Sequence, residues 1–144
     1  MSPNEYQKAA LRTESTVSIT RVLEKLLRLK TGDGDAILAV MSMCNAGKLD
    51  VGMIRLVNGT MGMCGESGEV EEIIKKHIFQ GHELDTEHIA KELGDVAWYL
   101  AVAADAIGYS LEDIFKMNID KLQNRYPGKG FDSNLSQNRK DGDI

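Results

Sequence analysis

Two short segments, ESGEV at 66–70 and ELGDV at 92–96, share the pattern Glu-x-Gly-acid-Val. Each segment places two carboxylates three positions apart, Glu66 with Glu69 and Glu92 with Asp95. Side chains at this spacing lie on the same face of a helix. Paired carboxylates of this kind can bind a hard divalent cation or move a proton. The two segments are therefore the first candidates for chemistry.

The neighbours of these acids indicate where the carboxylates point. With 100° of rotation per residue, Val70 and Ile73 fall on the same helix face as Glu66, and Val96 falls on the same face as Glu92. An acid within an apolar stripe faces the core side of a helix. We therefore expect two helices to bring their carboxylates together at the core.

Two further glutamates of the first segment differ from this pattern. Glu71 and Glu72 are each followed four positions later by a lysine, Lys75 and Lys76. Such pairs stabilise an exposed helix face by roughly 0.2–0.5 kcal/mol each. We expect these glutamates to lie in solvent and to take no part in chemistry.

A glycine precedes the second acid of each pair. Gly68 and Gly94 each cost roughly 1 kcal/mol of helix stability. Close approach of another backbone is a reason to keep glycine at such a position. The sequence thus predicts tight helix packing at these two glycines.

A third segment supplies the opposite charge. Asn118, Lys121 and Arg125 recur at spacings of three and four on a stripe that also contains Leu111 and Leu122. We expect this stripe to face the core, with its basic side chains beside the carboxylates.

The size of the charge repulsion suggests what occupies such a cluster. Four carboxylates about 5 Å apart repel by roughly 3 kcal/mol per pair at an effective dielectric near 20. One lysine and one arginine do not balance this. Mg²⁺ prefers carboxylate oxygens together with waters and substrate phosphates, and Mn²⁺ is an alternative ion. The sequence therefore predicts a Mg²⁺ site formed by the four acids, with Lys121 and Arg125 suited to phosphate oxygens.

Other interpretations of the same residues stay open. Glu66 could instead form a core salt bridge with Arg125, in a helical interaction protein without catalysis. A di-iron carboxylate bundle would place Glu-x-x-His on its helices, and the sequence contains no such motif.

The elements that must position these residues are helices. Apolar periodicity and capping residues predict an all-α bundle. The expected helices span residues 4–13, 15–30, 35–47, 51–79, 86–107 and 110–126, with a possible break in the glycine-rich part of the fourth. Asn4 and Thr86 are the expected N-caps of two helices, Ser110 with Asp113 resembles a capping box, and Pro127 ends the last helix.

Composition narrows the class of protein. The chain has 144 residues, a net charge of −5 and 42% hydrophobic residues, which suits one globular domain and disfavours binding to nucleic acid. The sequence contains no apolar run long enough to cross a bilayer and no secretory h-region, so we expect a cytoplasmic protein away from membranes.

We expect Cys44 and Cys64 to be buried thiols. We expect Trp98, which points away from the acidic stripe, to lie at a subunit interface.

The acidic segments, together with AKELGDVAWYLAVAADAIGYSLEDI and NIDKLQNRYPGKGF, resemble the MazG-like nucleotide pyrophosphohydrolases. The resemblance covers roughly residues 58–131, and the family pattern ExxE followed by ExxD is met by the four acids. It implies a four-helix-bundle-like MazG fold, with one domain at 1–131, a core at 51–127 and a polar tail or arm at 132–144. One departure is an insert of extra helices at about 13–50.

The resemblance also implies an activity. Members bind Mg²⁺ through Glu66, Glu69, Glu92 and Asp95, and hydrolyse a nucleoside triphosphate to the monophosphate and pyrophosphate. Glu69 is the expected acceptor of the water proton. The positions of Asn118, Lys121 and Arg125 match those that hold phosphates. Assembly as a homodimer or homotetramer is expected, and a phosphoribosyl-ATP pyrophosphohydrolase is the alternative of the same reaction type.

Overall fold

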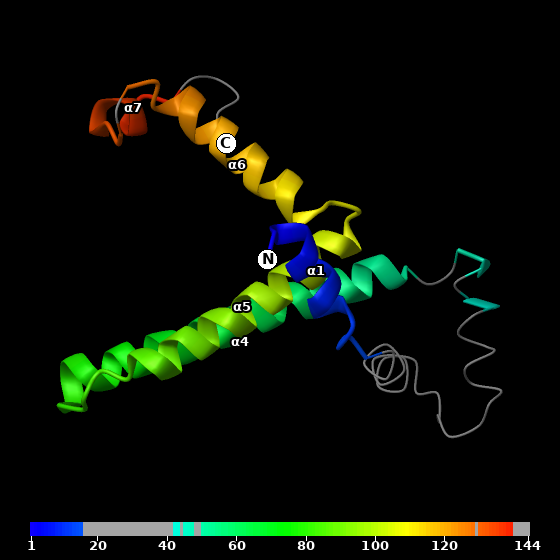
Figure 1. Cartoon of the computed structure of the whole chain (residues 1–144), viewed down its shortest axis with the longest axis horizontal. Helices are drawn as coiled ribbons and strands as arrows, with labels where there is room; N and C mark the ends of the chain where they lie inside the picture. Colours follow the sequence, from blue (N-terminus) through cyan, green and yellow to red (C-terminus); the bar gives the residue numbers. More distant parts are fainter. Residues whose placement is uncertain (16–41, 44, 48–49, 129, 140–144) are drawn as a thin grey trace.

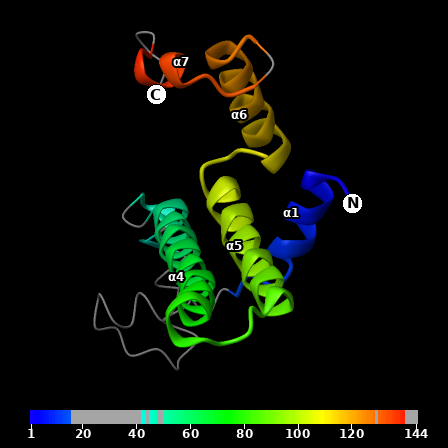
Figure 2. The same cartoon turned by 90° about the vertical axis from the view of Figure 1, so that its left-hand side faces the viewer.

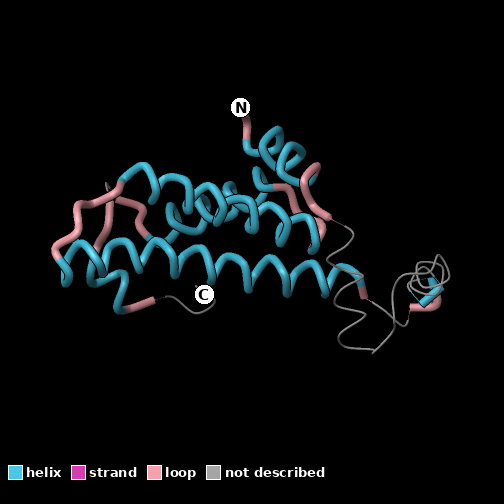
Figure 3. The backbone as a smooth tube through the Cα atoms, turned by 90° about the horizontal axis from the view of Figure 1, so that it is seen from below, coloured by secondary structure: helices cyan, strands magenta, loops and turns pink. Residues whose placement is uncertain are grey.

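The computed structural model describes residues 1–15, 42–43, 45–47, 50–128 and 130–139. Within these residues it contains helices and loops and no strand (Figure 3), which confirms the all-α class. No helix in the described part is long and apolar enough to cross a membrane. The helices are α1 (Pro3–Leu11), α4 (Val51–Gln80), α5 (Thr86–Ala106), α6 (Leu111–Arg125) and α7 (Ser133–Gln137).

A long hairpin of α4 and α5 forms the body of the molecule (Figure 1). α4 runs unbroken for 30 residues, so the possible break in its glycine-rich half is absent. Asp50 caps its start by accepting a hydrogen bond from the backbone of Met53, and Gly81 ends it at a positive φ of 72°. Glycine tolerates this left-handed conformation, which turns the chain toward α5.

Close packing between α4 and α5 occurs at two glycines of α4. A Cβ atom on Gly59 would come within 2.9 Å of the Cβ of Ala103, and one on Gly62 would overlap the ring of Tyr99. At Gly68 and Gly94 an added Cβ would meet nothing within 4 Å. The prediction of close packing at those two positions was therefore wrong, and the tight approach lies six to nine residues earlier in α4, at Gly62 and Gly59.

α1 packs on α5 on the side opposite to α4 (Figure 2). The small core there contains Ala101 and Ala104 of α5, with Ala10 of α1. The indole Nε1 of Trp98 donates to Oγ1 of Thr13 at 2.7 Å. Trp98 therefore packs within its own chain, and its expected place at a subunit interface is not supported.

Charged residues join the ends of three segments. The guanidinium of Arg55 on α4 contacts Glu14 at 2.6 Å and Asp105 of α5 at 2.7 Å. Hydrogen bonding of the guanidinium to the Glu14 carboxylate, which accepts, is the main cause that raises the pKa of Arg55. This cluster fixes the end of the α1 segment against the hairpin.

The start of α6 is held by its own cap and by α1. Ser110 accepts from the backbone of Asp113, which confirms the predicted cap, and its hydroxyl donates to the Asp113 carboxylate at 2.6 Å. The side chain of Gln7 accepts from the backbone N–H of Leu111 at 3.0 Å. Beyond this anchored first turn, α6 projects away from the α4–α5 hairpin (Figures 1 and 2).

Two predicted caps lie one or two positions from the observed ones. Ser2, rather than Asn4, caps α1 in a capping box with Glu5, and Asp85, rather than Thr86, caps α5. Asn4 instead bonds to Glu112 at the start of α6. Its amide therefore joins two helices.

The helices predicted at 15–30 and 35–47 fall almost entirely outside the described residues, and so does Cys44. Cys64 is exposed on α4, so its prediction as a buried thiol was wrong. In the segment expected to be a tail or arm, Asp132 caps the short helix α7.

Candidate metal and phosphate site

Three predicted ligands meet between α4 and α5. One carboxylate oxygen each from Glu66, Glu69 and Glu92 lies within 4.8 Å of the other two. Glu92 is buried, with 9% of its surface exposed, whereas Glu66 is partly buried and Glu69 is exposed. The acids thus lie at the edge of the hairpin, and the expectation that all four face a core was wrong within one chain.

The electrostatics of the cluster show that its charge is not balanced. The pKa of Glu66 is raised, first by partial desolvation and then by the neighbouring charges of Glu69, Asp95 and Glu92. A hydrogen bond between Glu66 and Glu92 adds to the rise. A proton is therefore held on the cluster more strongly than on an isolated carboxylate.

Asp95, the fourth predicted ligand, lies outside this group of three. It is exposed on α5, yet it is near enough to raise the pKa of Glu66. It also contributes, after burial, to the raised pKa of Tyr6. The Tyr6 hydroxyl donates to the carbonyl oxygen of Gly94 at 3.2 Å, which places α1 beside the second acidic segment.

Sequence reasoning missed one residue at this site. Nε2 of His88 lies 2.8 Å from Oε1 of Glu92. The signal was available, because the two residues are four positions apart and share a helix face.

The ion pairs of Lys75 and Lys76 differ in part from those predicted. Glu72 pairs with Lys76 at 3.4 Å as predicted, and Lys75 also bonds to Glu72 rather than to Glu71. The hydrogen bond from Lys75 is the main cause that lowers the pKa of Glu72. Glu71 is exposed, as predicted.

The predicted phosphate-binding residues do not meet the acids within one chain. Asn118 and Lys121 are exposed on the part of α6 that projects from the hairpin, and Arg125 ends that helix (Figure 2). The prediction that these residues face inward beside the carboxylates was wrong for a single chain. Leu111 at the start of the stripe is buried, but Leu122 is 38% exposed, so α4 and α5 leave the later part of the stripe uncovered.

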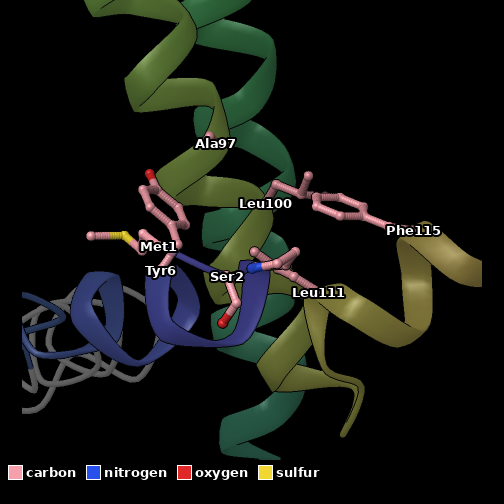
Figure 4. Close-up of a pocket in the computed structure, with 8 residues that line it drawn as sticks. Met1, Ser2, Tyr6, Ala97, Leu100, Leu111 and Phe115 are labelled. Atoms are coloured by element: carbon pink, nitrogen blue, oxygen red, sulfur yellow. The ribbon is translucent and has the colours of Figure 1, made fainter.

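An open pocket of about 370 Å³ lies between α1, α5 and the first turns of α6 (Figure 4). Leu100 and Phe115 point toward one another at one end, and Tyr6 and Met1 line the other. No carboxylate and no basic side chain lines this pocket. It supplies apolar surface rather than reactive groups.

The cluster of carboxylates from Glu66, Glu69 and Glu92 is suited to bind a divalent cation. Its donors are hard oxygens from two helices, they lie close together, and their mutual repulsion is expressed in the raised pKa of Glu66. Hard cations such as Mg²⁺ and Mn²⁺ take this kind of ligand.

Comparison with known proteins identifies the family. The MazG nucleotide pyrophosphohydrolase domain matches residues 58–129, half of the chain, so the protein belongs to the MazG family. It is 36% identical over 70 residues to the Gene 37 protein of Mycobacterium phage L5. That match covers 46% of this chain and 61% of the phage protein's length. No solved structure matches the chain.

Proposed function

We propose that the protein hydrolyses a nucleoside triphosphate, ribose or deoxyribose, to the monophosphate and pyrophosphate in a Mg²⁺-dependent reaction. The observation that carries the proposal is the convergence of Glu66, Glu69 and Glu92 at one edge of the α4–α5 hairpin, in a chain of the MazG family. The unbalanced charge there, expressed in the pKa of Glu66, supports a cation as partner.

Each acid has a role in this account. Glu66, Glu69, Glu92 and the adjacent Asp95 would hold Mg²⁺, or Mn²⁺ in its place. The bound ion would supply charge stabilisation at the phosphates and a more acidic water. Glu69, the exposed member of the close group, accepts the proton of the attacking water. It is suited to this because an exposed carboxylate at the rim can reach both water and substrate.

A second copy of the chain completes the site in this proposal. The apolar stripe of α6 begins at Leu111, which is 2% exposed, and continues at Phe115 and Leu122, which are 43% and 38% exposed. Because the stripe starts in the core and continues into solvent, it is suited to packing against another protein surface.

The opposite charges of α6 and of the carboxylate cluster favour the α4–α5 hairpin of a second copy as the surface on which α6 packs. Lys121 lies on the projecting part of α6, Arg125 ends the helix, and the carboxylate cluster carries the opposite charge. Packing of α6 on the hairpin of a second copy would bring Asn118, Lys121 and Arg125 to the phosphates of a bound triphosphate. There the basic groups stabilise charge on the departing pyrophosphate.

A nucleotide panel tests the reaction. Ribonucleoside and deoxyribonucleoside triphosphates are incubated with the full chain and Mg²⁺, and the products are identified by mass. We expect a monophosphate and pyrophosphate from at least one member of the panel. A panel with no turnover in Mg²⁺ or Mn²⁺ would leave the helical interaction protein as the better account.

A further inference from the structure

Glu92 lies close to two polar side chains, one from each helix of the hairpin. On one side a carboxylate oxygen of Glu92 lies within 4.8 Å of one from Glu66 of α4. On the other side its Oε1 lies 2.8 Å from Nε2 of His88, one turn earlier on α5. The Glu92 side chain is 12% exposed, whereas the His88 side chain is 51% exposed. The imidazole therefore approaches the most buried carboxylate of the cluster from solvent.

The backbone holds His88 in place for this contact. Asp85 caps α5 by accepting a hydrogen bond from the backbone N–H of His88 at 2.9 Å. The imidazole consequently starts from a fixed point in the first turn, and one helical turn separates it from Glu92. With Nε2 protonated, its N–H group lies close enough to Oε1 to pair with the Glu92 carboxylate.

We propose that His88 is a positioning residue that holds Glu92 in the orientation in which it binds the divalent cation. This inference rests on the metal site of the proposed function. Ligands of metals are commonly oriented by such hydrogen-bonding partners, and loss of the partner weakens metal binding by about 10–100-fold. The contact with His88 would order the Glu92 side chain before the ion arrives, so that less side-chain entropy is lost on binding.

Mn²⁺ binding without nucleotide tests the role, measured by the loss of the free-ion signal in electron paramagnetic resonance at one fixed, mildly alkaline pH. The variants are His88→Ala, His88→Gln and Lys91→Ala. His88→Ala removes the donor. His88→Gln restores an amide donor on the same helix face. Lys91→Ala breaks the Glu87–Lys91 pair, another contact at a spacing of four on α5, whose side chains are 81% and 68% exposed.

We expect His88→Ala to weaken Mn²⁺ binding by about 10–100-fold, His88→Gln to recover most of the loss, and Lys91→Ala to bind as the wild type does. A helix-stabilising role alone would affect His88→Ala and Lys91→Ala alike. Unchanged or tighter binding by His88→Ala overturns the inference, as does His88→Gln binding as weakly as His88→Ala. If the wild type itself binds no Mn²⁺, the metal site fails together with the inference. If the wild type binds Mn²⁺ and His88→Ala binds it equally well, the metal site stands and the inference fails.

Discussion

The ring of Tyr99 on α5 fills the space that a side chain at position 62 of α4 would need. Glu66 follows Gly62 by one turn, and Glu92 precedes Tyr99 by about two turns. This contact therefore fixes the relative register of the two helices, and the register brings the carboxylates together.

Gly62→Ala tests this contact. The added methyl group must displace an aromatic ring that is packed against α4, and overpacking of this kind costs about 1–3 kcal/mol of unfolding free energy. We expect a lower denaturation midpoint and weaker Mg²⁺ binding. Chemical denaturation, with and without Mg²⁺, measures both effects.

Gly65→Ala is the matched control, because an added Cβ there meets nothing within 4 Å. Alanine should stabilise the helix at this position by about 1 kcal/mol. Equal stability changes for the two substitutions would show that Tyr99 does not constrain the register.

Glu66→Gln should stabilise the protein in a chelator at neutral pH. An acid whose pKa is raised in the folded state stabilises that state when protonated, and this stability is lost as pH rises through the raised pKa. Glutamine does not ionise, so the variant avoids the loss, and the difference in melting temperature should disappear at acidic pH. With Mg²⁺ the order should reverse, since the wild type binds the ion better.

Glu72→Gln should change the melting temperature in the opposite direction and serves as a comparison. The pKa of Glu72 is lowered by Lys75, so its stabilisation is present at neutral pH and is lost as pH falls. Its removal should lower the melting temperature at neutral pH, with or without metal. If both variants changed stability in the same direction in chelator, the cluster would not be a site of unbalanced negative charge.

Mg²⁺ should stabilise the wild-type fold. An ion that binds only the folded state at a hundred times its dissociation constant adds about 2.7 kcal/mol. A melting temperature that does not move in millimolar Mg²⁺ would argue against the metal site.

Mixing of inactive variants tests the contribution of a second copy. Lys121→Ala should reduce turnover by about 10²-fold or more, the scale of losing a charge-stabilising donor. Glu66→Gln should be similarly impaired. If each site takes its acids from one chain and Lys121 from another, mixed oligomers contain sites with both intact residues, and activity should return on mixing. Activity that stays at the level of the separate variants would place both residues in one chain.

The class of fold and the helix face on which each acid lies could be predicted because they depend on local periodicity. The 3.6-residue repeat places Glu66 near Val70 on one helix face, and the matching pattern at Glu92 follows from the same rule. The cap at Ser110 was predictable for the same reason, since it involves residues only three apart.

The remaining features depend on contacts between distant parts of the chain. Periodicity could show that Lys121 lies on an otherwise apolar stripe of its helix. It could not show whether that stripe packs against the same chain or against another one. Gly62 and Gly68 look alike in sequence, and only the position of Tyr99 distinguishes them. Trp98 likewise donates a hydrogen bond to Thr13, which lies 85 positions away, and no local sequence pattern reveals such a pair.

The central claim is that the α4–α5 carboxylates hydrolyse a nucleoside triphosphate with release of pyrophosphate. The most direct measurement is the amount of pyrophosphate and monophosphate formed per triphosphate consumed, for the wild type, Glu69→Gln and Glu71→Gln with Mg²⁺. We predict one of each product per triphosphate in the wild type, a rate at least about 10²-fold lower for Glu69→Gln, and a nearly unchanged rate for Glu71→Gln, which is exposed outside the cluster. Release of orthophosphate in place of pyrophosphate, or equal rates for the two variants, would contradict the account.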